Sequence, residues 1–325
     1  MEKPKAIQFA WEFDGNGGGK PLLGDDISKE LKAKTLAWVH MDATHKETRS
    51  WLRKEVNYLD DLILNALLAD ETRPRILEFD EGVLLILRGM NFNEGADPED
   101  MVSVRLWIDP YRIISLERRK VKAIRSIEER LTHNKGPKDS GDFLVQLSTK
   151  LFEHMEPVLT ELDEDTDDIE EKIMESPDFN ERQTIVNIRK KAILFRRYIS
   201  PQRDVLQHLR TSDLSWLDAM HRRHIQESYD RVLRYVEDLD TVRERAQIVK
   251  DELTNALSDR LNKNLYILSV IAAIFLPLGF LTGLLGINIG GIPGANDPDA
   301  FWYFITGLAV VVVSQILLFK KLRWF

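Results

Sequence analysis

The chain has 325 residues, with 53 acidic against 45 basic side chains and a formal net charge of −8. Because residues 264–325 carry one net positive charge, residues 1–263 carry −9, which argues against nucleic acid as a partner and fits the attraction of cations. The sequence contains no cysteine, which excludes disulfides, thiolate metal sites and cysteine nucleophiles. Any zinc ion must therefore use oxygen, imidazole or water ligands, a set that favours exchangeable binding.

Residues 1–137 are predicted to form a mixed α/β domain, because strand and helix patterns alternate up to Gly136-Pro137. The N-terminus lacks an apolar signal segment, so we expect this domain to remain in the cytoplasm. The glycine cluster at 15–19 favours a hairpin turn over a phosphate-binding loop, because Pro21 stands where such a loop needs Ser or Thr. No catalytic constellation stands out, so an enzyme is not expected. Strands are expected at 6–13, 36–41, 75–78, 82–90, 101–108 and 112–116, and helices at 46–55, 59–69 and 120–131.

Two long helices are predicted next, at 142–175 and 179–210, with Ser176-Pro177-Asp178 between them. Together with the residues that flank them, they form an expected cytoplasmic helical pair over 138–212.

A stalk helix is expected over 213–264, beginning near Asp213 and meeting no Gly or Pro before Pro277. It runs directly into an apolar segment, and about 70 residues at 1.5 Å each give a helix on the order of 100 Å. Such a helix needs partners, which a symmetric bundle of copies would supply. Its apolar positions step by three or four residues and predict a narrow buried stripe: Val232, Val236, Leu239, Val242, Ala246, Val249, Leu253 and Leu257.

Two charge-free apolar segments, 265–285 and 301–319, are predicted to be transmembrane helices. As helices they would rise about 31 Å and 28 Å, against a hydrocarbon core of roughly 30 Å. The short loop between them, 286–300, requires an antiparallel hairpin, and residues 320–325 form a tail.

The orientation of this hairpin follows from the positive-inside rule. Lys and Arg flank both outer ends of the hairpin, whereas the loop contains neither, so both termini are expected in the cytoplasm and the loop outside. The flanking basic residues are Arg260, Lys263, Lys320, Lys321 and Arg323, and aromatic residues at Trp302, Tyr303 and Trp324 suit the membrane interface.

The sequence Gly286-Ile287-Asn288, at the end of the first span, resembles the Gly-x-Asn signature of the CorA-type divalent-cation transporter family, and Gly290-Gly291-Ile292-Pro293 continues the likeness. The resemblance covers the whole chain. It implies a funnel-shaped homopentamer in the inner membrane, with the first span lining an axial pore. The magnesium branch usually has an acidic residue where Gly294 stands, so the chain looks more like the zinc-transporter branch, which is associated with proton coupling.

The expected fold is thus an α/β cytoplasmic domain, then long helices that include a stalk continuous with the first of two transmembrane helices. The expected function is transport of Zn²⁺ without a resident cofactor. A magnesium channel gated by intracellular metal, and a membrane-anchored metal sensor or scaffold that does not conduct, are the alternatives.

The resemblance implies a selectivity filter at Gly286, Ile287 and Asn288. A ring of Asn288 amide and backbone carbonyl oxygens would replace or hydrogen-bond the hydration shell of a cation. The alternative is an Asn helix cap in a glycine-rich turn.

Counting back from Asn288 along the first span predicts a pore-lining row of small residues and leucines. The alternative is a stripe facing lipid or another helix. The row consists of Leu265, Leu268, Ala272, Leu276, Gly279 and Gly283, and Pro277 within the same span is expected to bend it.

Acidic residues are expected to attract cations by long-range electrostatics, with a solvated surface as the alternative. Seven carboxylates lie within residues 163–171. On the stalk, the predicted attracting positions are Glu237, Asp240, Glu244 and Asp251, with Asp230 and Asp259 beyond them.

His221 and His224, three residues apart on one helix, are a candidate pair of zinc ligands, and His208 is a candidate third. Exposed histidines without a metal are the alternative, because Arg222 and Arg223 lie between the pair.

Overall fold

The structure is a computed structural model that describes residues 5–70, 72–80, 82–287, 292, 294 and 296–321. The chain divides into two compact units, Met1–Asp251 and Glu252–Phe325.

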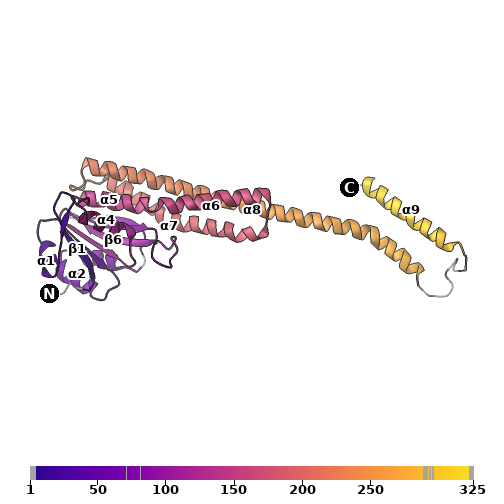
Figure 1. Cartoon of the computed structure of the whole chain (residues 1–325), viewed down its shortest axis with the longest axis horizontal. Coiled ribbons are helices and arrows are strands. Elements are labelled where there is room, and N and C mark those ends of the chain that lie inside the picture. The colour runs from indigo at the N-terminus through magenta and orange to yellow at the C-terminus, as the bar shows by residue number, and fades with distance from the viewer. Residues whose placement is uncertain are drawn as a thin grey trace. The chain divides into compact units, whose positions relative to one another are not determined.

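A seven-stranded sheet forms the centre of the N-terminal domain, in the order β2-β1-β3-β7-β6-β5-β4 (Figure 1). All neighbouring strands are antiparallel except β3 and β7, which run parallel. Two short elements, β2 and α1, were not predicted. The strands are β1 (Ile7–Phe13), β2 (Gly19–Pro21), β3 (Ala37–Asp42), β4 (Arg75–Glu78), β5 (Val83–Gly89), β6 (Val102–Ile108) and β7 (Arg112–Glu117).

The central strands are buried along almost their whole length because helices cover both faces of the sheet. On one face, Leu84, Trp107 and Ile114 pack in one apolar cluster with side chains of α2 and α3. On the other face, the Trp38 ring meets Phe143 of α5 edge-on, with 4.9 Å between the ring centroids. The covering helices are α1 (Asp25–Glu30), α2 (Thr48–Glu55), α3 (Asp61–Leu68), α4 (Lys122–Thr132) and α5 (Ser140–Glu153).

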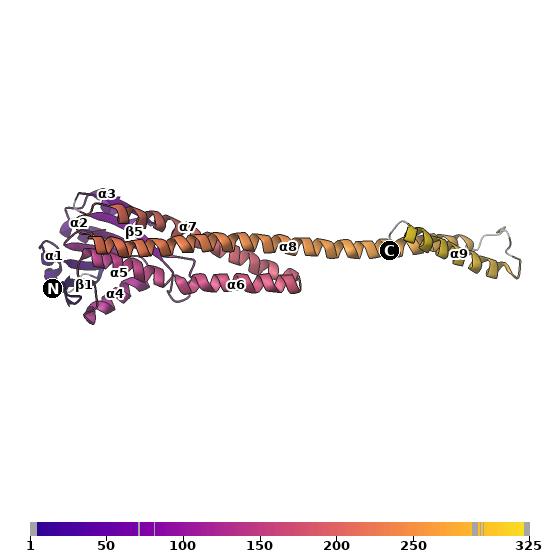
Figure 2. The same ribbon diagram turned by 90° about the horizontal axis from the view of Figure 1, so that it is seen from above.

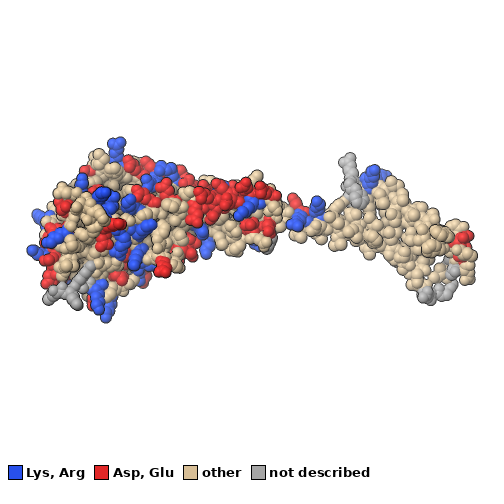
Figure 3. Space-filling view, viewed as in Figure 1, with Lys and Arg blue, Asp and Glu red and all other residues tan. Residues whose placement is uncertain are grey.

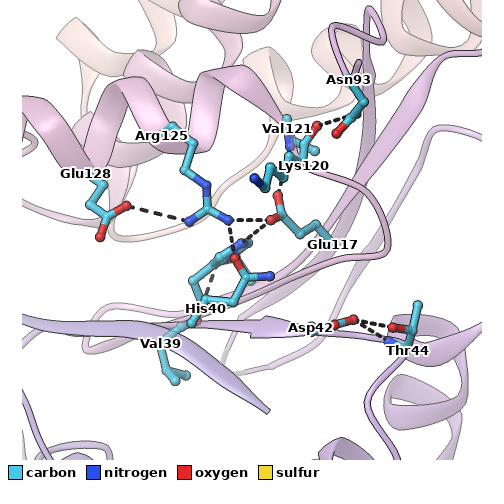
Figure 4. A network of polar contacts seen from close by, with 12 residues as sticks. Val39, His40, Asp42, Thr44, Asn93, Glu117, Lys120, Val121, Arg125 and Glu128 are labelled. Atoms are coloured by element: carbon cyan, nitrogen blue, oxygen red, sulfur yellow. Dashed lines mark hydrogen bonds and ion pairs between the residues drawn. The ribbon is translucent and has the colours of Figure 1, made fainter. Parts of the chain in front are cut away.

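A buried polar network lies where β3, β7 and α4 meet (Figure 4). The His40 Nδ1 lies 2.7 Å from Ser115 Oγ, and its Nε2 lies 3.3 Å from Glu117 Oε1. Glu117 also accepts hydrogen bonds from Arg125 Nη2 at 2.5 Å and from the Val121 N–H at 2.8 Å. Burial lowers the pKa of His40, which is fully buried, so the imidazole is neutral beside a carboxylate that Arg125 already balances.

Long helices follow: α6 (Glu156–Glu175), a short 3-10 turn (Phe179–Glu181), α7 (Arg182–Thr211) and α8 (Ala219–Leu285). The prediction of one helix over 142–175 is wrong. The helix breaks between α5 and α6, and Pro157, which has no N–H to donate, occupies the first turn of α6.

Helix α8 begins later than the predicted start near Asp213. The Asp218 side chain accepts a 2.8 Å hydrogen bond from the His221 N–H and so caps the first turn. Of the eight predicted stripe positions, seven are buried and Leu257 is half-buried, which confirms the packing face of the stalk.

The second unit contains the end of α8 and α9 (Ala300–Lys321), which runs back antiparallel beside it (Figure 2). Both helices are long and apolar enough to cross a membrane. Within residues 265–285 and 301–319, the least exposed residues identify the contact face, and all of them except Ala272 form one stripe on each helix. They are Val270, Ala272, Ala273, Ile274, Leu278 and Leu281 on α8, and Phe304, Leu308, Val311, Val312, Gln315 and Phe319 on α9.

Candidate ion pathway

The predicted filter lies at the end of α8. Asn288 is outside the described residues, so its role as a ring of oxygens stays a prediction. Gly286 closes the helix by donating its N–H to the Thr282 carbonyl at 2.9 Å. A Cβ at Gly286 would lie 2.9 Å from the same Thr282 oxygen, so the turn into the loop requires glycine.

The predicted pore-lining row lies on the face of α8 that points away from α9. With 3.6 residues per turn, the row centred on Gly279 is about half a turn around the helix from the contact stripe centred on Ile274. Within the described structure, Leu265, Leu268 and Leu276 are 60%, 62% and 71% exposed, and nothing lies within 4 Å of a Cβ built at Gly279 or Gly283. Only Ala272 is half-buried. The described part of the chain therefore does not cover the row, which is available to other copies, to water or to lipid.

Pro277 lies inside α8, near the middle of its apolar segment, and the helix continues through it. Proline has no N–H, so it cannot bond the carbonyl four residues earlier, which belongs to Ala273. That carbonyl instead accepts the Gln315 Nε2 of α9 at 3.4 Å. The amide thus satisfies the backbone acceptor that the proline leaves free, as required in an apolar environment. Gln315 was missed at the level of sequence, although an amide within a 19-residue apolar segment is itself a signal.

The four predicted cation-attracting residues differ in their surroundings. Glu237, Glu244 and Asp251 are exposed on α8. The Asp240 carboxylate instead pairs with Arg196 of α7 at 2.7 Å and with Arg243 at 3.2 Å. Asp240 therefore joins two helices, whereas the other three remain available to act on ions at a distance.

Three carboxylates of the acidic run on α6 form ion pairs with α8. The Arg245 Nε donates to Glu170 Oε1 at 3.0 Å, its Nη1 to Asp163 Oδ1 at 3.2 Å, and its Nη2 to Asp167. These three carboxylates share one face of α6, and the hydrogen bond to Glu170 is the largest cause that raises the pKa of Arg245. The remaining acids of α6 are exposed, and Figure 3 shows acidic side chains gathered over this part of the molecule.

The two candidate zinc ligands each have an acidic neighbour. His221 Nδ1 lies 3.1 Å from Asp218 Oδ1 and its Nε2 lies 3.4 Å from Asp139 Oδ1. His224 lies 3.6 Å from Glu227. The predicted third ligand, His208, pairs with Glu78 at 3.0 Å.

No group of three His, Cys, Asp or Glu residues that could hold a metal is found in the described part of the chain. A zinc ion shared by His221 and His224 stays a prediction, without a described third side chain to complete it.

Related proteins align with nearly the whole chain. The profile of the family described as CorA-like Mg2+ transporter protein matches residues 33–321. Zinc transport protein ZntB of Pectobacterium carotovorum is 36% identical over 315 residues, which cover 97% of this chain and 95% of that protein. Divalent cation transporter CmaX of Pseudomonas aeruginosa is 34% identical over 326 residues, which cover 98% of this chain and 97% of that protein.

Two solved structures have the same architecture. The structure of the full-length CmaX protein gives a TM-score of 0.85 at 34% identity and covers 100% of this chain and 99% of that one. The CorA magnesium transporter from Methanocaldococcus jannaschii gives a TM-score of 0.80 over 100% of both chains, at 20% identity, and so shows the fold alone. These matches confirm the expected fold of each chain: an α/β domain, a long helix and a second apolar helix. The chain belongs to the family of CorA-like Mg2+ transporter proteins.

Proposed function

We propose that the chain transports divalent metal cations, with Zn²⁺ as the substrate, through an axial pore formed by a homopentamer in the inner membrane. The observation that carries the proposal is the uncovered row on α8, which faces away from α9 and ends at Gly286 and Ile287. The relatives named for zinc and for divalent cations, at 36% and 34% identity, support the choice of substrate.

In this pore, each copy would contribute one α8 row toward the axis, while α9 lies outside and closes the hairpin. The leucines of the row would form apolar rings that gate by dewetting, and the small residues would allow close approach of neighbouring helices. At the outer end, a ring of Asn288 oxygens would hold a hydrated ion. Because these amide oxygens carry no full charge, they would bind the ion weakly enough for it to leave.

Proton coupling is the finer part of the proposal. The sequence has no Asp, Glu or His between Asn264 and Phe319 other than Asp297 and Asp299, which lie in the loop. A proton that accompanies the metal would therefore cross on water or on hydroxide bound to the ion.

The filter is tested by zinc flux into proteoliposomes that contain the purified full chain. Asn288→Ala should abolish uptake of Zn²⁺ while the oligomer elutes at its native size, because the ring of amide oxygens is lost. Asn296→Ala, an exposed amide in the same loop, is the matched control and should retain flux. Wild-type flux through a correctly assembled Asn288→Ala protein would refute the filter, and an absence of flux through the wild type would favour a sensor or scaffold.

The magnesium alternative is tested in the same vesicles. The family description names Mg²⁺, so parallel assays with Mg²⁺ and Zn²⁺ decide between the two substrates. A zinc transporter should move Zn²⁺ at low micromolar concentration and Mg²⁺ poorly, and the reverse order would identify a magnesium channel.

The orientation is part of the proposal, with both termini in the cytoplasm and the loop outside. Because the chain has no cysteine, Asn296→Cys introduces a single thiol. A membrane-impermeant maleimide should label it in intact spheroplasts, and labelling only after lysis would reverse the orientation.

A further inference from the structure

The outer segment of the first span, residues 278–285, has little support from its own helix. It follows Pro277, which removes one backbone hydrogen bond from α8, and it contains Gly279 and Gly283. Glycine inside a helix lowers the stability of that helix, because its backbone loses more conformational freedom on folding. Nothing in the described structure lies within 4 Å of a Cβ built at either glycine, so close packing against the described chain does not explain them. A segment of this kind depends on support from a neighbouring helix.

Helix α9 supplies a polar contact where the outer segment begins. Three hydroxyl side chains of the spans donate to carbonyl oxygens of their own helices, at 2.8 or 2.9 Å: Ser269, Thr282 and Thr306. The Gln315 amide instead crosses between the helices, and its Nε2 donates to the Ala273 carbonyl at 3.4 Å. This carbonyl is the acceptor that Pro277 leaves free. The contact therefore joins α9 to α8 directly before the outer segment.

The contact satisfies only one end of the Gln315 amide. Its Oε1 is buried and has no hydrogen-bond partner in the described part of the chain. An apolar side chain would pack against α8 without this cost, because hydrocarbon penalises an unpaired polar atom. Hydrogen bonds between membrane helices are also individually weak, so this one can break and re-form. Both properties suit a contact that controls the position of α8 over one that only holds the two helices together.

We propose that Gln315 is a positioning residue of the ion pathway, whose amide holds α8 at Pro277 and so fixes the direction of the outer segment. The proposal rests on the proposed function, because this direction matters for transport only if the α8 row lines the pore. With the bond formed, Gly279 and Gly283 continue the row of leucines toward the filter. With the bond broken, Pro277 becomes a hinge. Gln315 lies on the face of α9 that contacts α8, so it acts through α8 and not on the ion.

Hydrogen–deuterium exchange of the purified full chain in detergent tests this support without transport. Gln315→Leu removes the donor and should speed exchange of the N–H groups of residues 278–285 by about threefold, the factor that corresponds to an average hydrogen bond between membrane helices. Gln315→Asn keeps an amide but is one methylene too short to reach Ala273, so it should have the same effect. Ser314→Ala, at the exposed neighbouring position, is the control and should change nothing. Unchanged exchange in Gln315→Leu would overturn the proposal.

A proline variant tests whether the amide acts at the Ala273 carbonyl. Pro277→Ala supplies the missing N–H, which can bond this carbonyl within α8. In the Pro277→Ala background, Gln315→Leu should therefore leave the exchange of residues 278–285 unchanged. An equal acceleration in both backgrounds would overturn the proposal, because the amide would then act at some other point.

Zinc flux into proteoliposomes, measured per assembled oligomer, tests the role in transport. Gln315→Leu should lower the maximal rate by about threefold and change the half-saturating Zn²⁺ concentration by less than about twofold, because the ion does not contact this side chain. The same substitution should have no effect on the rate in the Pro277→Ala background. A purely structural role would reduce the amount of assembled protein and leave the rate per oligomer unchanged. An unchanged rate in Gln315→Leu refutes the positioning role alone, whereas an absence of flux through the wild type refutes the proposed function itself.

Discussion

The two units of the chain hold α8 to a neighbouring helix in different ways. In the first unit, Arg245 of α8 binds three carboxylates of α6, and Asp240 binds Arg196 of α7. In the second unit, α8 meets α9 through an apolar stripe and one side-chain amide, Gln315, on the Ala273 carbonyl. The surrounding medium explains the difference. Water solvates the exposed charged atoms of the contacts in the first unit, whereas hydrocarbon around the apolar helices of the second unit penalises every unpaired polar atom.

This comparison also shows that acidic residues on one helix can have different roles. Carboxylates that face another helix, such as Asp163 and Asp240, serve assembly of the domain. Carboxylates that face water, such as Glu237 and Glu244, are exposed, and the predicted attraction of ions would depend on them. Composition alone cannot separate the two groups.

The largest effect is expected from breaking the charged contact. Arg245→Ala would leave Asp163, Asp167 and Glu170 close together without a cation, so we expect a loss of about 2 kcal/mol in unfolding free energy. Thermal unfolding of the purified chain measures it, with Arg223→Ala, an exposed arginine of the same helix, as the control. A loss no larger than that of the control would mean that apolar packing alone joins α6 to α8.

A second effect comes from the buried network around His40. Because burial lowers the folded-state pKa of His40, the folded protein binds this proton less readily than the unfolded chain. The contribution of neutral His40 to the free energy of unfolding should therefore be fully present above about pH 6.5. It should fall as the pH drops from there to the folded pKa, by up to about 1.4 kcal/mol per pH unit.

Unfolding midpoints between pH 7.5 and 5.5 test this expectation. Partial burial, Lys122 and Lys150 also lower the pKa of His154, which adds a slope of the same sign. His40→Gln should therefore reduce the slope without removing it, and His133→Gln, an exposed histidine, should leave it unchanged. A stability that rises on acidification would contradict the neutral state of His40.

The amide contact of the second unit should have a smaller effect. Gln315→Leu removes the donor to Ala273, and hydrogen bonds between membrane helices contribute roughly 0.6 kcal/mol on average. Pro277→Ala supplies an N–H for the same carbonyl, so the cost of Gln315→Leu should be lower in that background. A double-mutant cycle on unfolding in mixed micelles measures this coupling, and additive losses would show that the proline and the amide act independently.

The smallest effect concerns the exposed acids. Neutralising Glu237, Glu244 and Asp251 together should weaken the apparent affinity for transported metal by about twofold at low salt and less at high salt, because charges more than about 10 Å apart are screened at 0.1 M. Flux in a salt series measures it. Asp240→Asn is the contrast, since it should lower stability through Arg196 with little effect on the salt dependence. A single substitution that removes most of the affinity would indicate a discrete metal site in place of diffuse attraction.

Local pattern was sufficient for much of the fold. The two apolar segments, the stalk stripe from Val232 to Leu253 and most strands of the sheet were predictable, because each depends on composition or on a period of two or 3.6 residues. The row on α8 could be predicted as a face for the same reason. The family signature around Gly286 is also readable from the sequence alone, and the proposed role of Asn288 still rests on that signature.

Tertiary structure decided which polar residues are available for function and which are occupied by structural contacts. Arg245 and Glu170 are 75 positions apart, and Gln315 and Ala273 are 42 apart, so no local period links either pair. Burial and the identity of the facing element set the energy of a polar group, and both exist only once the chain is folded.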